Sequence, residues 1–536
     1  MKLLSLIRPW SLTSVRGKSD FFITTPIYYV NATPHIGHLY TSLLADASHR
    51  FHRLLGKENS VFCTGTDEHG TKVQQAASAS GLPLDKYCNR ISSEYKAIFD
   101  QMEIGYTDFI RTTDEKHKDK VRWFWERLKK NGHISEGSYA GWYCDADEMF
   151  LTDSQLKKVT TGDGKESIVS AESGRPVHWV EESNYKFDLP SFKDELLQWL
   201  NKPGTVKPEK FRQLLLFWLS EGVADRDVSV SRPKSRVHWG IPVPEDDSQT
   251  IYVWLDALIN YVTVGHPEKW PPTIQVLGKD ILKFHGIYWP AFLLAADLEL
   301  PKCLMVHSHW LVEDEKMSKS RGNVVSPFEA SEMYSGEGLR YFLLREGTPD
   351  SDSNYSSTKI VRFVNAELAD TLGNLLNRCC GKTINRSQIF PAFDRQAVDE
   401  YCSSSLMSAV GKLQDNVAES YKEMNFYRGI AEIMGALHGA NKFFEDSKPW
   451  ELKKHPDKQR HLDAVLHLTM ETLRIAGIAL TPIVPSLSNR LLVKLNVDVS
   501  RRRWHDMVPS WSNGNQSSNI PLSSSRDVLF KKIMVS

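Results

Sequence analysis

Two short motifs contain the side chains that are best suited to bind nucleotide phosphates. The first reads HIGH at positions 35–38, and the second reads KMSKS at positions 316–320. If the first motif begins a helix, His35 and His38 lie on one face of it, where free N–H groups and partial positive charge also gather. Gly37 lets a ligand approach the backbone closely. The lysines of the second motif are compact positive charges that suit a leaving phosphate group.

The two motifs resemble the signature pair of the class I aminoacyl-tRNA synthetases, and this resemblance implies chemistry at the α-phosphate of ATP. When a carboxylate attacks that phosphate and pyrophosphate leaves, negative charge builds on the phosphate oxygens, and fixed donors stabilise it better than a nucleophile would. We expect the lysine segment to be a polar loop that closes only when ATP is bound. Taken alone, H-x-x-H is also typical of a metal-binding or helix-capping pair, and K-x-x-K of a solvated run of charge. The two motifs together favour catalysis.

Aromatic segments elsewhere in the chain could form a binding slot. One segment, which we interpret as a strand, runs from Tyr252 to Ala257 and continues to Tyr261. Gly278-Lys279-Asp280 precedes Phe284-His285, and Tyr28-Tyr29 end an earlier apolar run. Such a slot suits a thioether, which is polarizable and contacts aromatic rings favourably. The alternative is that these rings belong only to the core.

A β-α-β unit is predicted to position the first motif. Phe21 to Val30 has the composition of a strand interrupted by Pro26, and a helix with leucines at helical spacing follows Pro34. Gly56 ends that helix, and Ser60 to Thr66 forms the next strand, followed by Asp67. Ligands bind outside the carboxyl ends of such strands, so His35, His38 and Asp67 are expected at one edge.

The remainder of the chain divides into segments that differ in composition and in the spacing of apolar residues. Residues 139–225 contain strand-like runs around a polar tip and then a helical stretch, which we interpret as an insertion into the nucleotide-binding fold. Beyond Arg340 the chain is helical, with apolar-periodic segments near 361–380, 405–424, 427–446 and 461–480, typical of an α-bundle. The Ser/Asn-rich segment from Pro509 to Arg526 is expected to be a linker or loosely held arm.

Composition limits the possible partners and compartments. The chain has 536 residues, 41% of them hydrophobic and 25% charged, with a formal net charge of zero. These values suit a globular protein of about two to four domains, whose contacts with nucleic acid must come from local patches. Seven cysteines without a C-x-x-C pair indicate free thiols in a reducing compartment. No apolar run approaches the roughly 20 residues of a membrane helix.

The first segment has the character of an organellar transit peptide. Four basic residues and four serines precede the first acidic residue, Asp20, and the apolar run Leu3 to Ile7 is too short for a secretory signal. This composition predicts import into mitochondria, with an ordinary basic terminus as the alternative.

Longer segments together resemble the methionyl-tRNA synthetases, a family of class I aminoacyl-tRNA synthetases. These segments read PIYYVNATPHIGHLYT, GTDEHG, YVWLDALINY, GKDILKFHGIYWP and EKMSKSRGN, and the similarity runs from Phe21 to Leu492. The leader suggests the mitochondrial type. The resemblance implies an α/β fold, namely a Rossmann-like nucleotide-binding domain with a connective insertion, followed by an α-helical bundle that binds the anticodon. It also implies ATP-dependent ligation of methionine to tRNA(Met) through methionyl-adenylate, for translation in the mitochondrial matrix.

The resemblance also implies the roles of individual residues. Catalysis would involve His35, His38, Lys316 and Lys319. ATP, entering as its Mg²⁺ complex, would contact His35, Gly37, His38, Lys316, Met317, Ser318, Lys319 and Ser320. Methionine would be bound by Tyr29, Asp67, Trp254, Ala257, Tyr261, Asp280 and His285. In that set Asp67 would hold the α-amino group, and Asp280 would meet the ribose or the amino group.

The segment GNLLNR matches the anticodon-reading helix of the family, with Asn374 and Arg378 at the recognition positions and Trp450 as their partner. Helix geometry at about 100° per residue supports this match independently, because Asn374 and Arg378 fall opposite an apolar face. That face consists of Leu368, Leu372, Leu375, Leu376 and Cys379. Exposed polar residues opposite a core stripe are otherwise ordinary. An outward amide and guanidinium beside a tryptophan can bind and stack splayed bases.

One feature departs from the family pattern. Many members carry a zinc knuckle of paired cysteines in the insertion, whereas here only Cys144, in GWYCDADEMF, occupies that region. A structural zinc site needs four ligands, so no zinc is expected.

We expect six segments: transit peptide 1–19, first catalytic half 20–138, insertion 139–225, second catalytic half with the lysine loop 226–340, anticodon-binding domain 341–495 and tail 496–536. An insertion of this length is too short to include a hydrolytic editing domain as well. We expect a monomer that binds no membrane. Two alternatives stay open, namely a paralogue that keeps the fold only as an RNA-binding scaffold, and a nucleotidyltransferase with an H-x-G-H helix, which would not need the helical domain.

Overall fold

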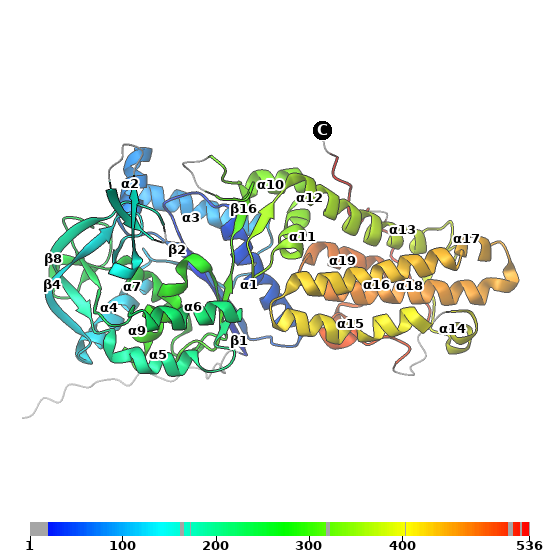
Figure 1. The fold of residues 1–536 in the computed structure, drawn as a ribbon. Coiled ribbons are helices and arrows are strands. Elements are labelled where there is room, and N and C mark those ends of the chain that lie inside the picture. Colours follow the sequence, from blue (N-terminus) through cyan, green and yellow to red (C-terminus); the bar gives the residue numbers. More distant parts are fainter. Residues whose placement is uncertain are drawn as a thin grey trace, which may run out of the picture.

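The protein has an α/β part and a helical part that follow one another along an elongated molecule (Figure 1). The structure is a computed structural model that describes residues 20–160, 166–171, 173–317, 322–402, 404–512, 518–525 and 528–534. Within these ranges, no helix combines the length and the apolar character needed to cross a membrane.

Six parallel strands form the central sheet, in the order β3-β2-β1-β14-β15-β9. Their bounds are β1 (Phe21–Tyr29), β2 (Ser60–Asp67), β3 (Asp108–Arg111), β9 (Val206–Lys207), β14 (Ile274–Gly278) and β15 (Leu304–His307). The helices of this part include α1 (Ile36–Leu54), α2 (Thr71–Ser80), α3 (Leu84–Gln101), α4 (Glu115–Lys130) and α9 (Trp289–Ala295). The strand order reverses at β1, which pairs with both β2 and β14, and ligands of such sheets bind at that crevice.

The predicted β-α-β unit is confirmed. Strand β1 shifts its register against β2 between Thr24 and Ile27, where Pro26 cannot donate a hydrogen bond. Helix α1 begins directly after His35, and Gly56 follows its end with a φ of +89°. The register pairs Tyr29 with the last residue of β2, so the ends of both strands meet at one edge.

The insertion forms a separate antiparallel sheet in the order β10-β8-β4-β5. Its elements are β4 (Ile134–Cys144), β5 (Met149–Leu151), β8 (His178–Phe187), β10 (Val228–Ser229) and the hairpin β6 (Leu156–Thr160) and β7 (Glu166–Ser170). Helices α5 (Lys193–Leu200) and α6 (Glu209–Ser220) follow. Strand β9 lies within the range that we assigned to the insertion, yet it pairs with β15 of the central sheet.

The prediction of a strand from Tyr252 to Ala257 is wrong. Strands β11 (Ser231–Pro233), β12 (Pro242–Val243) and β13 (Asp246–Ile251) form a small sheet that ends just before it. The chain then forms the short helices α7 (Val253–Leu258) and α8 (Asn260–Gly265). A short apolar run fits a buried helix as well as a buried strand, and here tertiary packing overrides the β-propensity of the aromatic residues.

The helical part confirms the four apolar-periodic segments. The first forms α12 (Ser357–Phe363), the π-helical η6 (Val364–Gly373) and α13 (Asn374–Cys380), and the others form α15 (Ser404–Lys422), α16 (Phe426–Asp446) and α18 (Gln459–Leu480). The flanking helices are α10 (Pro327–Tyr334), α11 (Gly336–Glu346), α14 (Arg395–Tyr401), α17 (Pro449–Leu452) and α19 (Pro485–Lys494). One hydrophobic core runs from α1 into this bundle.

A buried arginine joins the two parts. Arg340 of α11 is 1% exposed, and its guanidinium donates to the carboxylate of Asp46 in α1 at 2.6 Å. The same side chain donates to the carbonyl oxygens of Met102 at 2.7 Å and of Ile483 at 3.0 Å. Separating Arg340 from Asp46 would leave a buried charge without its partner, which costs free energy. This cost holds α1, the helix that begins with the HIGH motif, against α11 of the helical part.

The tail is not the loosely held arm that we expected. Strand β20 (Ile520–Pro521) pairs with β19 (Ile389–Phe390), and Leu529 and Phe530 are buried against the bundle. Ser/Asn-rich composition predicts few apolar anchors, but Trp511 within the segment is also buried. Residues 513–517 and 526–527 lie outside the described ranges.

Candidate functional site

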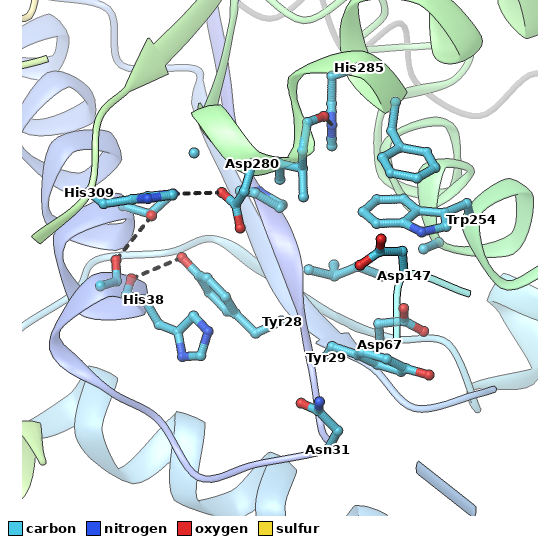
Figure 2. A pocket seen from close by; sticks show the side chains of 18 of the residues that line it. Tyr28, Tyr29, Asn31, His38, Asp67, Asp147, Trp254, Asp280, His285 and His309 are labelled. Atoms are coloured by element: carbon cyan, nitrogen blue, oxygen red, sulfur yellow. Dashed lines mark hydrogen bonds and ion pairs between the residues drawn. The ribbon is translucent and has the colours of Figure 1, made fainter. Parts of the chain in front are cut away.

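A cavity of about 480 Å³ opens at the carboxyl ends of β1 and β14. Figure 2 shows His38, Asp280 and His309 toward one end of it, and Tyr29, Asp67 and Trp254 toward the other. Twelve of the predicted site residues line this one cavity: Tyr29, His35, Gly37, His38, Asp67, Trp254, Ala257, Tyr261, Asp280, His285, Lys316 and Met317. The predicted residues Ser318, Lys319 and Ser320 lie outside the described ranges.

Both histidines of the HIGH motif cap helix α1 and are held as donors. His35 Nδ1 accepts from the backbone N–H of Gly37 at 3.1 Å, and His38 Nδ1 accepts from the backbone N–H of His35 at 3.4 Å. A neutral ring that accepts at Nδ1 carries its proton on Nε2. The helix-capping alternative is therefore correct as well, and the two rings stack at 3.6 Å between centroids.

Burial keeps His38 neutral. The ring is removed from water and lies beside His35, and both effects lower the pKa of His38 well below its usual value. Its Nδ1 also lies 3.0 Å from the hydroxyl of Tyr95, which stacks on Tyr28 of strand β1. These contacts fix the ring, so its N–H is a preorganised donor rather than a charge that varies near neutral pH.

The start of the lysine motif lies over the first turn of α1. Strands β16 (Trp310–Val312), β17 (Glu315–Lys316) and β18 (Ser353–Tyr355) form the sheet that leads to it. A Cβ on Gly37 would lie 3.8 Å from Cε of Met317 and 2.9 Å from the ring of His35, so glycine leaves the room that both side chains occupy. After the loop, the carbonyl of Val325 accepts from the N–H of Ile36.

Asp280 lies at the same end of the cavity as the lysine motif. Its carboxylate pairs with Nε2 of His309 at 3.2 Å. The cavity walls partly shield Asp280 from water, which raises its pKa, but the hydrogen bond to His309 and the charges of His309 and Lys316 together bring that pKa below its usual range. The carboxylate is therefore ionised at neutral pH and can accept hydrogen bonds from hydroxyl or ammonium groups.

Asp67 at the end of β2 is a buried carboxylate with an unsatisfied oxygen. Its Oδ1 has no hydrogen-bond partner among the described residues. Burial, with the nearby charges of Asp256 and Glu148, raises the pKa of Asp67 well above its usual value. A cationic group bound here would relieve both penalties, so this end of the cavity is suited to an ammonium ion.

Aromatic side chains from α7 and the following π-helical segment η4 (Phe284–Tyr288) form an apolar wall. Trp254 stacks on Phe284 at 3.7 Å between ring centroids. His285 donates from Nδ1 to the carbonyl of Ile281, and burial lowers its pKa to about 4. The neutral ring then accepts at Nε2 from the hydroxyl of Tyr261, at 2.8 Å. Asp147 also lines the cavity and lies near Trp254 (Figure 2).

A buried network supports the wall from behind. Asp256 of α7 lies between His69 at 2.7 Å and His117 at 2.8 Å. Burial raises the pKa of Asp256, but the charges and hydrogen bonds of His69 and His117 lower it to about 2. The carboxylate fixes α7, which carries Trp254 and Ala257, against β2 and α4.

Sequence reasoning missed several residues that line the cavity, among them Asn31, Lys72, Glu148 and His309. His309 follows the end of β15 in the segment VHSHW, and a histidine at the carboxyl end of a parallel strand could have indicated it. Glu148 gives no such signal, because it reaches the cavity from the insertion.

The described residues contain no group of three or more His, Cys, Asp and Glu side chains placed to hold a metal. Cys144 is buried at the end of β4, where removal from water raises the pKa of its thiol. The expectation that no structural zinc is bound stays a prediction.

The three predicted anticodon residues lie at the far end of the bundle. Asn374 is exposed on α13. The guanidinium of Arg378 lies 5.8 Å from the centre of the Trp450 ring and pairs with Glu445 at 2.6 Å. The apolar face predicted for this helix is buried, which confirms the helical-wheel argument. The structure thus brings a guanidinium and an indole together on a partly exposed surface.

Comparisons with known proteins agree with this geometry. The sequence profile described as "tRNA synthetases class I (M)" matches residues 21–380. The mitochondrial methionine–tRNA ligase of Homo sapiens is 46% identical over 506 residues, covering 90% of this chain and 84% of the human protein. The probable mitochondrial methionine–tRNA ligase of Dictyostelium discoideum is 42% identical over 91% of this chain and 88% of its own length.

Solved structures show the same arrangement of both parts. Methionyl-tRNA synthetase of Mycobacterium tuberculosis in complex with methionyl-adenylate superimposes with a TM-score of 0.87 at 34% identity, covering 95% of this chain and 99% of that chain. The ligand-free form of the same bacterial enzyme superimposes with a TM-score of 0.82 at 29% identity.

Proposed function

The chain belongs to the methionine-specific class I tRNA synthetases, and we propose that its cavity binds ATP and methionine end to end. It is a methionine–tRNA ligase that uses ATP to form methionyl-adenylate and transfers the methionyl group to tRNA for mitochondrial translation. One observation is the main support for the roles that we propose for individual residues. A single cavity joins the histidine and lysine motifs to an unpaired buried carboxylate and an aromatic slot.

His35, His38 and the lysine motif act on the phosphates. The Nε2–H groups of both histidines donate to the oxygens of the reacting phosphate, where charge builds as the methionine carboxylate attacks. Lys316 and Lys319, with Met317, Ser318 and Ser320, close over the leaving pyrophosphate. ATP enters as its Mg²⁺ complex, in which the ion is held mainly by phosphate oxygens and water.

Methionine occupies the other end of the cavity. Asp67 accepts from the α-ammonium group, which relieves the unpaired carboxylate. The thioether enters the slot lined by Tyr29, Trp254, Ala257, Tyr261 and His285, where the rings offer sulfur–aromatic contacts. Asp280, ionised beside His309, accepts from the ribose or from the amino group.

The far end of the bundle reads the anticodon of tRNA(Met). The Arg378 fork and the Asn374 amide donate to splayed bases, and Trp450 stacks on one of them. The chain has no net charge, but Lys448, Lys453 and Lys454 flank Trp450 and supply a local basic patch for the phosphate backbone. Glu445, which pairs with Arg378, must give up that contact when a base binds.

The remaining assignments are also proposals. We place the enzyme in the mitochondrial matrix, with residues 1–19 as its transit peptide, and we propose a monomer without structural zinc. We propose domain boundaries at 20–138, 139–225, 226–340, 341–495 and 496–536. Strand β9 belongs to the insertion range but pairs with β15 of the central sheet.

Pyrophosphate exchange with a panel of amino acids tests this function. We expect labelled pyrophosphate to enter ATP only when methionine is present, at a rate far above that with leucine or valine. Exchange with no amino acid would favour an RNA-binding scaffold, and exchange into CTP with an alcohol phosphate would favour a nucleotidyltransferase.

A further inference from the structure

One acidic side chain of the insertion reaches the amino-acid end of the cavity. Glu148 lies in the turn between β4 and β5, lines the cavity and is 5% exposed. Its φ of +53° lies in the left-handed region, which residues other than glycine seldom adopt. This conformation turns the side chain away from the insertion sheet and toward the ends of β1 and β2.

The Glu148 carboxylate joins three segments that are distant in sequence. Its Oε2 and Oε1 accept from the hydroxyl of Tyr29 at 2.9 and 3.1 Å. Oε1 also accepts from the hydroxyl of Thr71 and from the backbone N–H of Lys72, the latter at 3.2 Å. Glu148 thus fixes the Tyr29 ring against the first turn of α2.

Gly70 leaves the space that this contact requires. A Cβ at Gly70 would lie 2.5 Å from the hydroxyl oxygen of Tyr29 and 3.4 Å from Oε1 of Glu148. The φ of Gly70 is +101°, a conformation that also favours glycine. Two backbone positions with positive φ therefore meet at the Tyr29 hydroxyl.

We propose that Glu148 is a positioning residue for methionine, which acts by holding the Tyr29 ring at the wall of the amino-acid slot. This inference rests on the proposed placement of methionine beside Tyr29 and Asp67. The insertion thereby takes part in amino-acid recognition, because the slot is complete only when the β4–β5 turn is seated. The contacts are charge-assisted and buried, the setting in which hydrogen bonds contribute most.

A double-mutant cycle between Tyr29 and Glu148 tests the proposal. The variants are Glu148→Ala, Tyr29→Phe and the pair combined, assayed by pyrophosphate exchange with methionine and ATP varied separately. We expect each single variant to raise the KM for methionine about tenfold, with little change in the KM for ATP. The double variant should match the single ones, because both remove the same contact.

Two further variants separate positioning from general structure. Glu148→Gln keeps the shape and one acceptor oxygen for Tyr29 and Thr71, so its KM for methionine should lie much closer to the wild-type value than that of Glu148→Ala. Asp145→Ala is the matched control in the same turn. Its side chain is 71% exposed and pairs with His178 at 3.4 Å, away from Tyr29, so both KM values should stay unchanged.

The outcomes separate this inference from the function on which it rests. A wild-type enzyme that fails to activate methionine refutes the proposed function. An active wild type whose Tyr29→Phe variant keeps a normal KM for methionine overturns the role of Glu148, even if Glu148→Ala does not fold. Equal increases in both KM values, or additive effects in the double variant, overturn it as well.

Discussion

Hydrogen bonding fixes what the two histidines of the HIGH motif can do. Each ring accepts a backbone N–H at Nδ1, and removal from water together with the neighbouring His35 lowers the pKa of His38 well below its usual value. The same two contacts cap helix α1. One set of bonds therefore builds the helix terminus and orients the rings that we propose as catalytic donors.

The first prediction concerns these donors and the lysine loop. Changing His38 or Lys319 to alanine removes one transition-state donor, which costs about 3 kcal/mol, or about a hundredfold in rate. Methionine binding should remain close to normal. Single-turnover adenylate formation, followed beside equilibrium methionine binding, measures both quantities. His505, which is exposed and far from the cavity in sequence, provides a control alanine variant with a normal rate. An unchanged rate in both test variants contradicts the assignment.

The second prediction concerns the stability of the empty enzyme. The pKa of Asp67 is raised in the folded protein, so its contribution to stability is lost as pH rises through that value. At neutral pH, Asp67→Asn should therefore increase the free energy of unfolding by about 1 kcal/mol, while methionine binding is lost. Urea denaturation without methionine measures this effect.

The gain from Asp67→Asn has a defined dependence on pH. Near the ordinary carboxyl pKa of about 4, Asp67 is protonated in the folded state and the difference between the variants should vanish. The prediction is contradicted if the gain in unfolding free energy is equal at pH 5 and pH 8, or if Asp67→Asn is less stable than the wild type at neutral pH. Either result would show that the Asp67 carboxylate does not destabilise the empty enzyme.

At the scale of elements, α7 and η4 form the aromatic wall of the cavity, which we propose as the amino-acid slot. Trp254 and His285 each contribute a ring to its wall, and the Asp256 network holds α7 from behind. We expect Trp254→Ala and His285→Ala to raise the methionine requirement about tenfold or more, at about 1.4 kcal/mol per tenfold, with much less effect on ATP. Steady-state exchange kinetics measure the split. An equal effect on both substrates points to unfolding instead.

The insertion gives a prediction about metal content. Cys144 is buried on β4, and within the described residues no set of ligands surrounds it. Elemental analysis of the purified protein should find no stoichiometric zinc, and a chelator should leave the melting temperature unchanged. One zinc per chain would overturn this prediction.

The elements differ in how far the sequence could predict them. Helix α1 was predictable because Pro34, the leucine spacing and Gly56 are local signals. The segment from Tyr252 to Ala257 was not, because its buried helical form depends on histidines far away in the chain. The edge strand β9 and the seated tail depend on partners distant in sequence for the same reason.

Site residues divide in the same way. Those within motifs, such as His38 and Asp67, could be assigned to one edge of the sheet from strand order alone. Glu148 could not, because its approach from the insertion depends on a turn with positive φ and on the space at Gly70. The assigned roles remain predictions that the variants above test.

At the scale of the whole molecule, the proposed anticodon surface and the cavity lie in different parts joined through Arg340. Trp450→Ala should remove a base-stacking platform worth about 1–3 kcal/mol, and Arg378→Ala a hydrogen-bonding fork. Aminoacylation of tRNA should fall about ten- to a hundredfold, whereas pyrophosphate exchange stays near normal.

Changing the anticodon of the tRNA tests whether Trp450 recognises the anticodon or only supports the fold. Changing the anticodon of the tRNA should impair the native enzyme much more than the Trp450 variant, which has already lost the contact. If both enzymes respond equally to the swap, Trp450 is structural and the reading surface lies elsewhere.

The buried carboxylate of Asp67 also has a consequence for how long the enzyme persists when the methionine concentration changes. A ligand that binds only the folded state stabilises it, and in the proposed placement methionine also supplies a partner for the unsatisfied Oδ1 of Asp67. When methionine is scarce, the pocket empties and a larger fraction of the enzyme unfolds, where proteases act on it. The abundance of the enzyme should therefore follow the supply of its own amino acid, without a dedicated sensor.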